Sequence, residues 1–298
     1  METLPNLQSR ATTTKNRSVQ VSHSAASKLM ATSQVTMDFL GHSCEDVFPA
    51  AFSQVAAMKK SSTNNSVLDC GLSHHFSNGE KQCFDILSED PARVKRFAGA
   101  MEFTNLPGSF VSAAQELVPG VDWPSLGSIH LVDVGGSSGA TARELLRNVP
   151  SIAKVTVQDL PEVIAAVKPE HRPADLADRL AFETGNFFER QKITDAHVYL
   201  LRRILHDWPS DKTLEIFRNL VPSMPAGSRL VVNDAVVPES NDEPYLAKVT
   251  RAADLQMMVA LNARERTLGE WQAIAREATG GELEFESVRG NVLVWRKV

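Results

Sequence analysis

The sequence has few cysteines, no long apolar run and no excess of positive charge. Its 298 residues include three cysteines, Cys44, Cys70 and Cys83, and none of them forms a Cys-x-x-Cys pair. An odd number of widely spaced cysteines argues against a disulfide framework and favours a reducing compartment. We therefore expect a cytoplasmic protein whose cysteines remain thiols.

Two further absences narrow the class of partner. No apolar run approaches the roughly 18 residues of a membrane span, and the N-terminus lacks the apolar centre of a signal peptide. A net charge of -5 and a pI of about 5.9 supply no positive field for a phosphate backbone. We expect no membrane and no nucleic-acid partner, which leaves a small-molecule site as the default.

What the sequence does contain is one apolar segment, His130–Gly139, that ends abruptly in small residues. A strand, a tight turn and a helix beginning at Ala140 are predicted there. Glycine permits backbone conformations closed to other residues and lets a ligand approach the main chain. Taken alone, this pattern fits a nucleotide-type site and an ordinary turn between strand and helix equally well.

Strand and helix patterns alternate after this segment. The strands are expected at 155–158, 180–183, 196–201 and 229–232, and the helices at 161–167, 211–220, 246–261 and 268–278. This alternation predicts an α/β fold with a doubly wound, Rossmann-like parallel sheet. Residues 283–288 and 291–296 are expected to close the chain as an antiparallel hairpin on the sheet edge.

The front of the chain has helical spacing and no strand pattern. Between residues 22 and 60 the apolar residues recur at three and four, and Gly41 and Pro49 interrupt them, which predicts two helices. The polar stretch 61–79 predicts a loop that contains His74 and His75. Adjacent histidines do not converge on one ion, so we expect no metal site there.

Asp159 ends the second predicted strand, twenty residues after Gly139. A doubly wound fold places a carboxylate at this point to bind a ribose diol, although Asp159 could also cap the helix that follows. A nicotinamide dinucleotide turn would place glycines at 137 and 140, where this chain has Ser137 and Ala140. The turn is closer to one that holds S-adenosylmethionine than to one that holds a pyrophosphate.

Five linked motifs make this resemblance specific. In order they are Leu131–Gly136, Gln158–Pro161, Gly185–Phe188, His206–Trp208 and Ala263–Thr267. Their order and spacing resemble those of the caffeic-acid-type O-methyltransferases, in particular the fungal branch, and the likeness runs from about residue 22 to residue 298. The resemblance implies the S-adenosylmethionine-dependent methylation of a hydroxyl on a small aromatic or polyketide-like acceptor.

The resemblance also implies catalytic roles for three residues. His206 matches the general base that takes the proton from the acceptor hydroxyl, and imidazole suits this task because its pKa lies near neutral pH. Glu265 matches the carboxylate that orients the base, and Asp234 lies at the second orienting position, where plant members carry Glu. Without the resemblance, these side chains would read as a helix-start histidine, a solvated helix-end charge and a turn residue.

The cofactor residues implied by the resemblance come from three of the motifs and the strand before His206. They are Asp133, Gly135, Gly136, Asp159, Leu160, Asn186, Phe187 and Arg202. Asn186 replaces the usual Asp that faces the adenine amine, and its amide oxygen can accept the same hydrogen bond. Arg202 replaces a Lys, and Phe187 could equally be a core residue. Methyl transfer of this kind needs no metal.

The front of the chain departs most from the family. Family members carry a winged-helix dimerisation segment before the helices that residues 22–60 resemble, and roughly a hundred such residues are missing from this sequence. The resemblance implies a tail at 1–20 without fixed structure, a helical dimerisation and acceptor-lid region at 21–125, and an S-adenosylmethionine-binding catalytic domain at 126–298. The retained helices imply a homodimer.

Two other functions remain open at this level. One is a relative that keeps the cofactor but catalyses a cyclisation or rearrangement, using the sulfonium charge electrostatically. The other is an accessory subunit of a biosynthetic complex, suggested by the shortened front segment. The presence of His206 together with two acids favours the methyltransferase.

Overall fold

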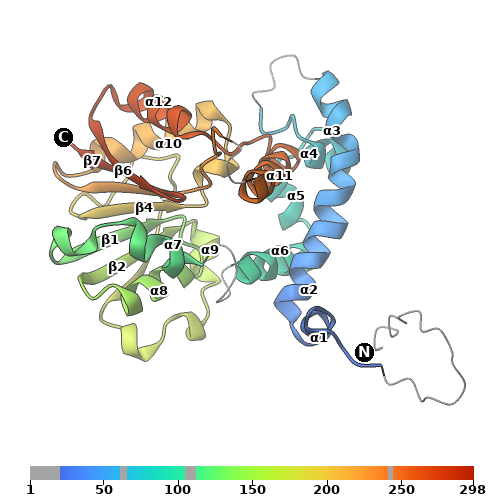
Figure 1. Cartoon of the computed structure of the whole chain (residues 1–298), viewed down its shortest axis with the longest axis horizontal. Coiled ribbons are helices and arrows are strands. Elements are labelled where there is room, and N and C mark those ends of the chain that lie inside the picture. The colour runs from blue at the N-terminus through green and yellow to red at the C-terminus, as the bar shows by residue number, and fades with distance from the viewer. Residues whose placement is uncertain (1–20, 61–65, 105–111, 241–243) are drawn as a thin grey trace, which may run out of the picture.

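A seven-stranded sheet forms the centre of one half of the molecule (Figure 1). The computed structural model describes residues 21–60, 66–104, 112–240 and 244–298. The strands are β1 (Ile129–Val134), β2 (Ile152–Asp159), β3 (Leu180–Thr184), β4 (Val198–Arg202), β5 (Arg229–Asn233), β6 (Leu283–Arg289) and β7 (Val292–Lys297). The expected tail at 1–20 lies outside the described residues.

The strand order is β3-β2-β1-β4-β5-β7-β6. The first five strands in this order run parallel, whereas β7 runs antiparallel to both β5 and β6. The order reverses between β1 and β4, which is where a doubly wound sheet opens a crevice for a ligand. The predicted doubly wound sheet with a C-terminal antiparallel hairpin is therefore confirmed.

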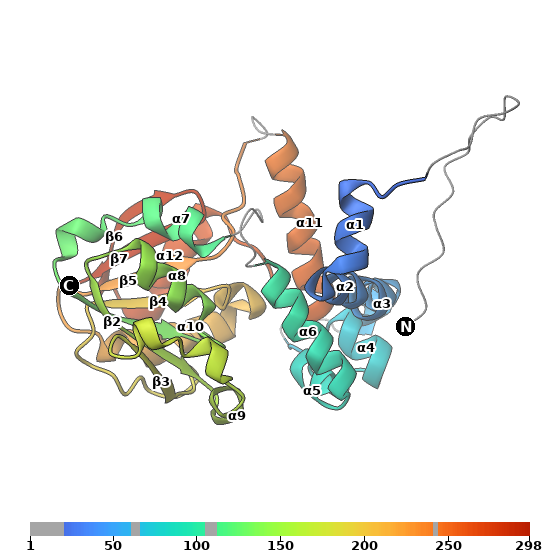
Figure 2. The same ribbon diagram turned by 90° about the horizontal axis from the view of Figure 1, so that it is seen from below.

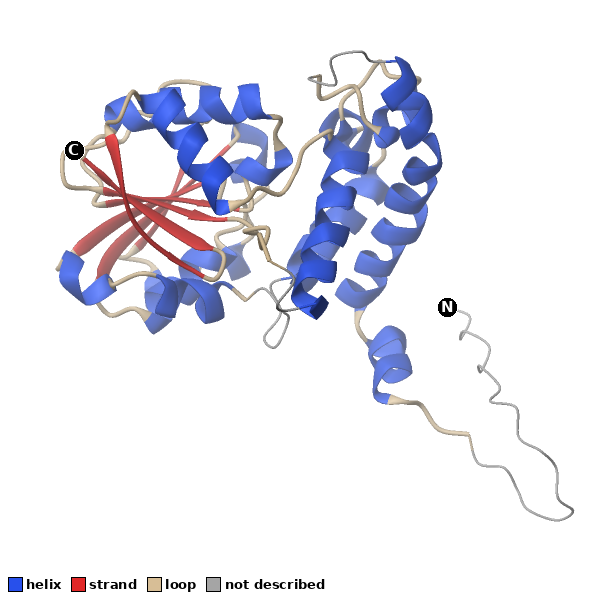
Figure 3. Ribbon diagram, turned by 45° about the horizontal axis from the view of Figure 1, so that its top comes forward, coloured by secondary structure: helices blue, strands red, loops and turns tan. Residues whose placement is uncertain are grey.

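Helices cover both faces of the sheet (Figure 3). They are α7 (Ala113–Gly120), α8 (Ala140–Asn148), α9 (Pro161–Ala165), α10 (Ser210–Leu220) and α12 (Leu268–Thr279). Leu117 and Leu145 pack with Leu131 on one face, and Phe217 packs with Trp271 on the other. Alternate residues of each strand face the two clusters, so the strands read as nearly continuous apolar runs in the sequence.

The front of the chain forms a helical layer beside the sheet (Figure 2). It contains α1 (Ala25–Thr32), α2 (Gln34–Gly41), α3 (Phe48–Lys60), α4 (Gly71–Ser77), α5 (Cys83–Ser88) and α6 (Pro91–Thr104). The later helix α11 (Pro244–Leu261) joins this layer, since Val259 and Ala260 pack against Ala50 and Leu72. A helix that lies late in the sequence thus completes the core of the front half.

Gly41 and Pro49 do not separate two helices, contrary to the expectation. A π-helical turn, His42–Val47, joins α2 to α3 without a break. The backbone N–H of Phe48 donates to the carbonyl of Ser43 across this turn. The wider turn shifts the hydrogen-bond register just before the proline, where the missing N–H would otherwise interrupt the helix.

His74 and His75 lie in α4 and not in a loop, which corrects the second expectation for the front. The Sγ of Cys70 accepts the N–H of Ser73 at the helix start, and Asn78 ends the helix in a left-handed conformation. The start of the helix contacts α3, where the N–H of Gly71 donates to the side chain of Gln54 at 2.7 Å. Tertiary packing outweighs the polar local sequence here.

No described helix has the length and apolar character needed to cross a membrane.

Candidate active site

The turn after β1 is built by backbone geometry. Gly135 has φ +75° and Gly139 has φ +73°, a conformation that glycine adopts without strain. The N–H groups of Gly135 and Gly136 both donate to the carbonyl of Gln158, at 2.8 and 3.1 Å. A Cβ on Gly136 would lie 2.6 Å from Oδ2 of Asp133, so a larger residue at this position would displace the turn or the carboxylate.

Asp133 lies beneath this turn and is almost completely buried. Burial raises the pKa of its carboxyl to about 7, although the nearby Arg202 opposes the rise. Its Oδ2 has no hydrogen-bond partner among the described residues. The Nε of Arg202 donates to Oδ1 of Asn233 at 2.9 Å, which holds the arginine at the end of β4. An unsatisfied buried acceptor of this kind calls for a donor from outside the chain.

Asp159 ends β2 and contacts the glycine turn directly. Its Oδ2 accepts the N–H of Ser137 at 2.8 Å, and its Oδ1 accepts the N–H of Leu160 at 2.8 Å. Burial raises the pKa of this carboxyl. The alternative capping role does not hold, because Leu160 occupies the cap position of α9 and α9 has no side-chain cap. Each carboxylate oxygen keeps a free lone pair for a ligand.

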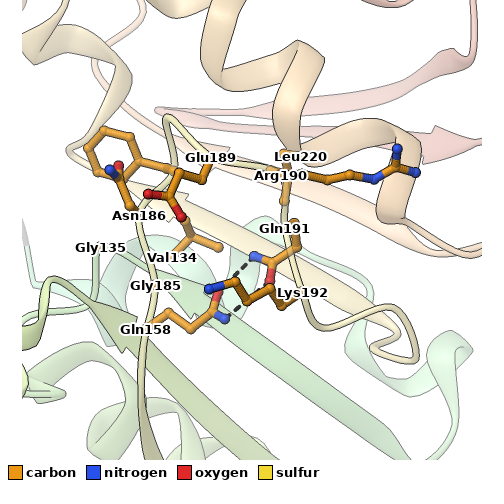
Figure 4. A pocket seen from close by; sticks show the side chains of 11 residues that line it. Val134, Gly135, Gln158, Gly185, Asn186, Glu189, Arg190, Gln191, Lys192 and Leu220 are labelled. Carbon is orange, nitrogen blue, oxygen red and sulfur yellow. Dashed lines mark hydrogen bonds between the residues drawn. The ribbon is translucent and has the colours of Figure 1, made fainter.

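A small, partly open pocket lies between the glycine turn and the loop after β3 (Figure 4). Gly135, Asn186 and Phe187 line it, together with the hydrogen-bonded pair Gln158 and Gln191. The Oδ1 of Asn186 accepts the N–H of Phe188 at 2.9 Å, which fixes the amide and leaves one lone pair of this oxygen. Three of the eight expected cofactor residues therefore meet at one cavity.

His206 lies in a short 3₁₀ turn, Leu205–Asp207, after β4. Its Nδ1 is 2.9 Å from Oε1 of Glu265, and its Nε2 is 3.5 Å from Oδ1 of Asp207. Glu265 comes from the segment between α11 and α12, fifty-nine residues later in the sequence. The structure brings these two expected catalytic side chains into direct contact.

Asp234 also lies beside His206, at the end of β5, but its hydrogen bonds go to backbone. Its Oδ2 accepts the N–H groups of Leu205 and His206, at 3.1 and 3.2 Å. Its Oδ1 has no hydrogen-bond partner in the described part of the chain. The aspartate therefore holds the turn that carries the histidine.

Buried carboxylates dominate the electrostatics around His206. Burial alone would lower the pKa of the imidazole, but Asp207, Asp234 and Glu265 outweigh it and raise that pKa to about 10. Burial raises the pKa of the Asp207 carboxyl to about 6, against the attraction of His206. The histidine is consequently an imidazolium at neutral pH in the free protein, with its charge balanced by carboxylates.

Aromatic side chains connect the turn that carries His206 to the helical layer. The ring of Trp208 contacts Phe188 at 4.7 Å and Phe187 at 5.9 Å between centroids, and Phe84 of α5 at 6.4 Å. A second, small hollow is lined by Phe84, Trp208 and Asp207 among others. This pocket lies beside the base turn, between the sheet half and the helical half.

The sequence analysis missed Asp207 as a member of the site. Its position directly after His206 was the available signal, because the residue that follows a base in a tight turn lies close to it. In the part of the chain that the structure describes, no group of three His, Cys, Asp or Glu side chains is arranged to hold a metal ion.

Comparisons with known proteins agree on one family. The sequence profile of the O-methyltransferase domain matches residues 70–280. The chain is 36% identical over 264 residues to the O-methyltransferase pgmB of Aspergillus terreus, covering 87% of this chain and 59% of pgmB. It is also 36% identical over 262 residues to the O-methyltransferase kk1A of Curvularia clavata, with coverage of 87% and 59%. The chain thus spans about 59% of the length of these relatives.

Solved structures share the fold. A structure titled "A Pericyclic Reaction enzyme" has a TM-score of 0.77 at 24% identity and covers 92% of this chain and 70% of that one. Human N-acetylserotonin methyltransferase in complex with SAM has a TM-score of 0.70 at 21% identity, with coverage of 90% and 72%. With a matched profile over most of its length, this chain belongs to the O-methyltransferase domain family.

Proposed function

We propose that this chain is an S-adenosylmethionine-dependent O-methyltransferase that methylates a hydroxyl of a small aromatic or polyketide-like metabolite. The observation that carries the proposal is the contact of His206 Nδ1 with Glu265 at 2.9 Å, next to the glycine turn after β1. A base oriented by a carboxylate, beside a cofactor-type turn, is the arrangement that proton removal during methyl transfer requires. The names of the curated relatives support the same activity.

The residues at the turn fit the cofactor. The carboxylate of Asp159 offers lone pairs to a ribose diol, and the partnerless Oδ2 of Asp133 offers an acceptor for an ammonium group. Gly135 and Gly136 keep the main chain open, and Leu160, Asn186, Phe187 and Arg202 surround the same edge of the sheet. When bound, S-adenosylmethionine would supply an electrophilic methyl group on a sulfonium.

His206 would remove the acceptor proton at Nε2. The contact of Nδ1 with Glu265 fixes the ring and leaves Nε2 directed away from that carboxylate, toward Asp207 at 3.5 Å. The imidazolium of the free protein must lose its proton before it can act, and a cation bound nearby favours that loss by repulsion. The buried carboxylates then stabilise the imidazolium that forms during the reaction.

The acceptor would lie against the aromatic wall of Phe84 and Trp208, in the pocket that Asp207 also lines. A planar ring stacks favourably on such side chains, and one edge of the pocket offers a carboxylate to a hydroxyl. We assign residues 21–125 to the acceptor lid and dimer contact, and residues 126–298 to cofactor binding and catalysis. Helix α11 is the exception to this division, because it packs within the lid.

We further propose that α3 pairs with a second copy of this chain. Phe48, Phe52, Val55 and Met58 are 63%, 87%, 61% and 50% exposed and follow one stripe of the helix. An apolar stripe of this size on a surface helix favours burial against a partner.

Substitution Phe52→Glu should convert a dimer to a monomer in light scattering after gel filtration. Val298→Glu, at the far end of the molecule (Figure 1), should leave the dimer unchanged. A wild-type monomer would sink the proposal.

Calorimetry and mass spectrometry together test the activity. We expect S-adenosylmethionine to bind the free protein, and a panel of phenolic polyketides to include an acceptor that gains one methyl group. Tight binding of a nicotinamide dinucleotide in place of S-adenosylmethionine would overturn the cofactor assignment. A product of unchanged mass, formed only with the cofactor present, would instead indicate the cyclisation or rearrangement activity.

A further inference from the structure

Arg266 is a charged side chain with no solvent exposure. It directly follows Glu265 in the sequence and precedes the start of α12. Burying a guanidinium is costly unless its donors are satisfied and its charge is balanced. The position of this side chain in the interior therefore needs a specific reason, and its hydrogen bonds supply one.

The guanidinium of Arg266 binds carbonyl groups on both sides of His206. Its Nη1 donates to the carbonyl of Leu205 at 3.1 Å, and its Nη2 donates to the carbonyl of Trp208 at 2.8 Å. Nη2 also donates to Oγ1 of Thr213 at 3.0 Å. The guanidinium carbon lies 4.9 Å from the ring of Trp271. A planar fork of donors can bridge two carbonyls in this way, and a lysine ammonium cannot reproduce that geometry.

Asp234 holds the same turn from the opposite side. Its Oδ2 accepts the N–H groups of Leu205 and His206, while Arg266 takes the carbonyls of Leu205 and Trp208. Both side chains are almost completely buried. Together they hold the backbone of this short turn at four points, two N–H groups and two carbonyl groups.

We infer that Arg266 and Asp234 are positioning residues, which clamp the backbone of the base turn so that the imidazole of His206 stays against Glu265 with Nε2 directed toward Asp207. This inference rests on the proposed role of His206 as the base. Both residues act through the backbone, whereas Glu265 acts on the ring itself. A displacement of about 1 Å at a reacting group can cost about a hundredfold in rate, which is the scale of effect such a clamp prevents.

The substitution Arg266→Lys tests the clamp because it keeps the charge and removes the fork. We expect NMR of the free protein, labelled with ¹⁵N-histidine, to show the hydrogen-bonded Nδ1–H signal of His206 in the wild type and its shift or loss in the variant. We expect kcat to fall about 10- to 100-fold while KM for S-adenosylmethionine stays within about threefold. A folded variant with the wild-type signal and the wild-type kcat would overturn the inference.

Two further variants keep the test decisive. Thr213→Val preserves side-chain volume and removes one partner of Arg266, so it should move the same signal by less. If Arg266→Lys does not fold, an unchanged signal in Thr213→Val overturns the inference. Arg229→Lys, which alters a surface pair with Glu286, is the matched control and should change neither readout. The NMR signal is read without turnover, so it tests the clamp independently of the reaction. Failure of the methyl-transfer assay would contradict the proposed function but would not change the NMR result.

Discussion

The two ends of the site are held by different kinds of interaction. At the cofactor end, Gly135 and Gly136 shape a turn through backbone hydrogen bonds and the absence of a Cβ. At the base end, His206 is held among buried carboxylates and its turn is gripped by charged side chains. The first end therefore depends on steric shape and the second on protonation, so substitutions at the two ends should fail in different ways.

Removal of the base should have the largest effect. We expect His206→Ala to lower kcat by about 10²- to 10⁴-fold, because general base catalysis contributes on that scale. The affinity for S-adenosylmethionine, measured by calorimetry, should change little, since His206 does not line the pocket beside the glycine turn. Comparable losses in affinity and in kcat would show that the two ends are not separable.

A Cβ at the cofactor end should act mainly on affinity. In Gly136→Ala the new atom would lie 2.6 Å from Oδ2 of Asp133 and 2.8 Å from Val157. We expect this clash to weaken S-adenosylmethionine binding about tenfold, equivalent to roughly 1.4 kcal/mol, with kcat at saturation nearly unchanged. Gly269→Ala is the matched control, because its Cβ would meet nothing closer than 3.9 Å.

The pH dependence of kcat/KM should reflect only the ionisable groups around His206. Since the pKa of His206 is raised to about 10 in the free protein, kcat/KM for the acceptor should increase with pH over a range above 6.5, although the cation of bound S-adenosylmethionine lowers that range below 10. Asp207→Asn removes one carboxylate and should shift this limb to lower pH by about one unit. Gly136→Ala should not change the pH range over which kcat/KM rises. A rise centred near pH 6.5 in the wild type would show that the carboxylates do not control the pKa of His206.

The same shift predicts a change in stability. A histidine whose pKa is higher in the folded than in the unfolded protein stabilises the fold fully below the unfolded pKa of 6.5 and loses that contribution as the pH rises to about 10. Thermal unfolding should therefore show a midpoint that falls between neutral pH and pH 10, and His206→Ala should flatten this slope.

The smallest effect is expected from Asn186→Asp, at the cofactor end. The new carboxylate keeps the contact with the N–H of Phe188 and is a stronger acceptor for an amine on the ligand. We expect S-adenosylmethionine to bind about two- to fivefold more tightly, as measured by calorimetry. Weaker binding would show that the asparagine NH₂ group is the one that faces the ligand.

The sequence predicted the sheet half better than the helical half, for a physical reason. Strands and crossover helices in the sheet half alternate, and Asp133 and Asp159 lie at strand ends while His206 follows one, so local patterns place them at one edge. In the front half, Gly41 and Pro49 are accommodated by a π-helical turn that depends on tertiary packing. No local pattern reveals such a turn.

Some contacts around His206 could not be predicted from the sequence. The motifs indicated that Asp234 accompanies His206, but they could not show that a side chain one methylene shorter than Glu binds the backbone of the turn. Likewise, nothing in the order of residues showed that Arg266 is buried, since an arginine beside a helix start is usually solvated. Both contacts join segments that are far apart in the sequence, so no local pattern indicates them.

The position of β7 between β5 and β6 has a consequence for closure of the sheet. β7 follows β6 in the sequence yet is an inner strand, and its residues Leu293 and Trp295 complete the core that Trp271 shares. Without 292–297 in place, β5 has an unpaired edge and that core is open, although none of the site residues is missing. Closure of the sheet half therefore requires that 292–297 pair with β5, and the site residues alone cannot supply it.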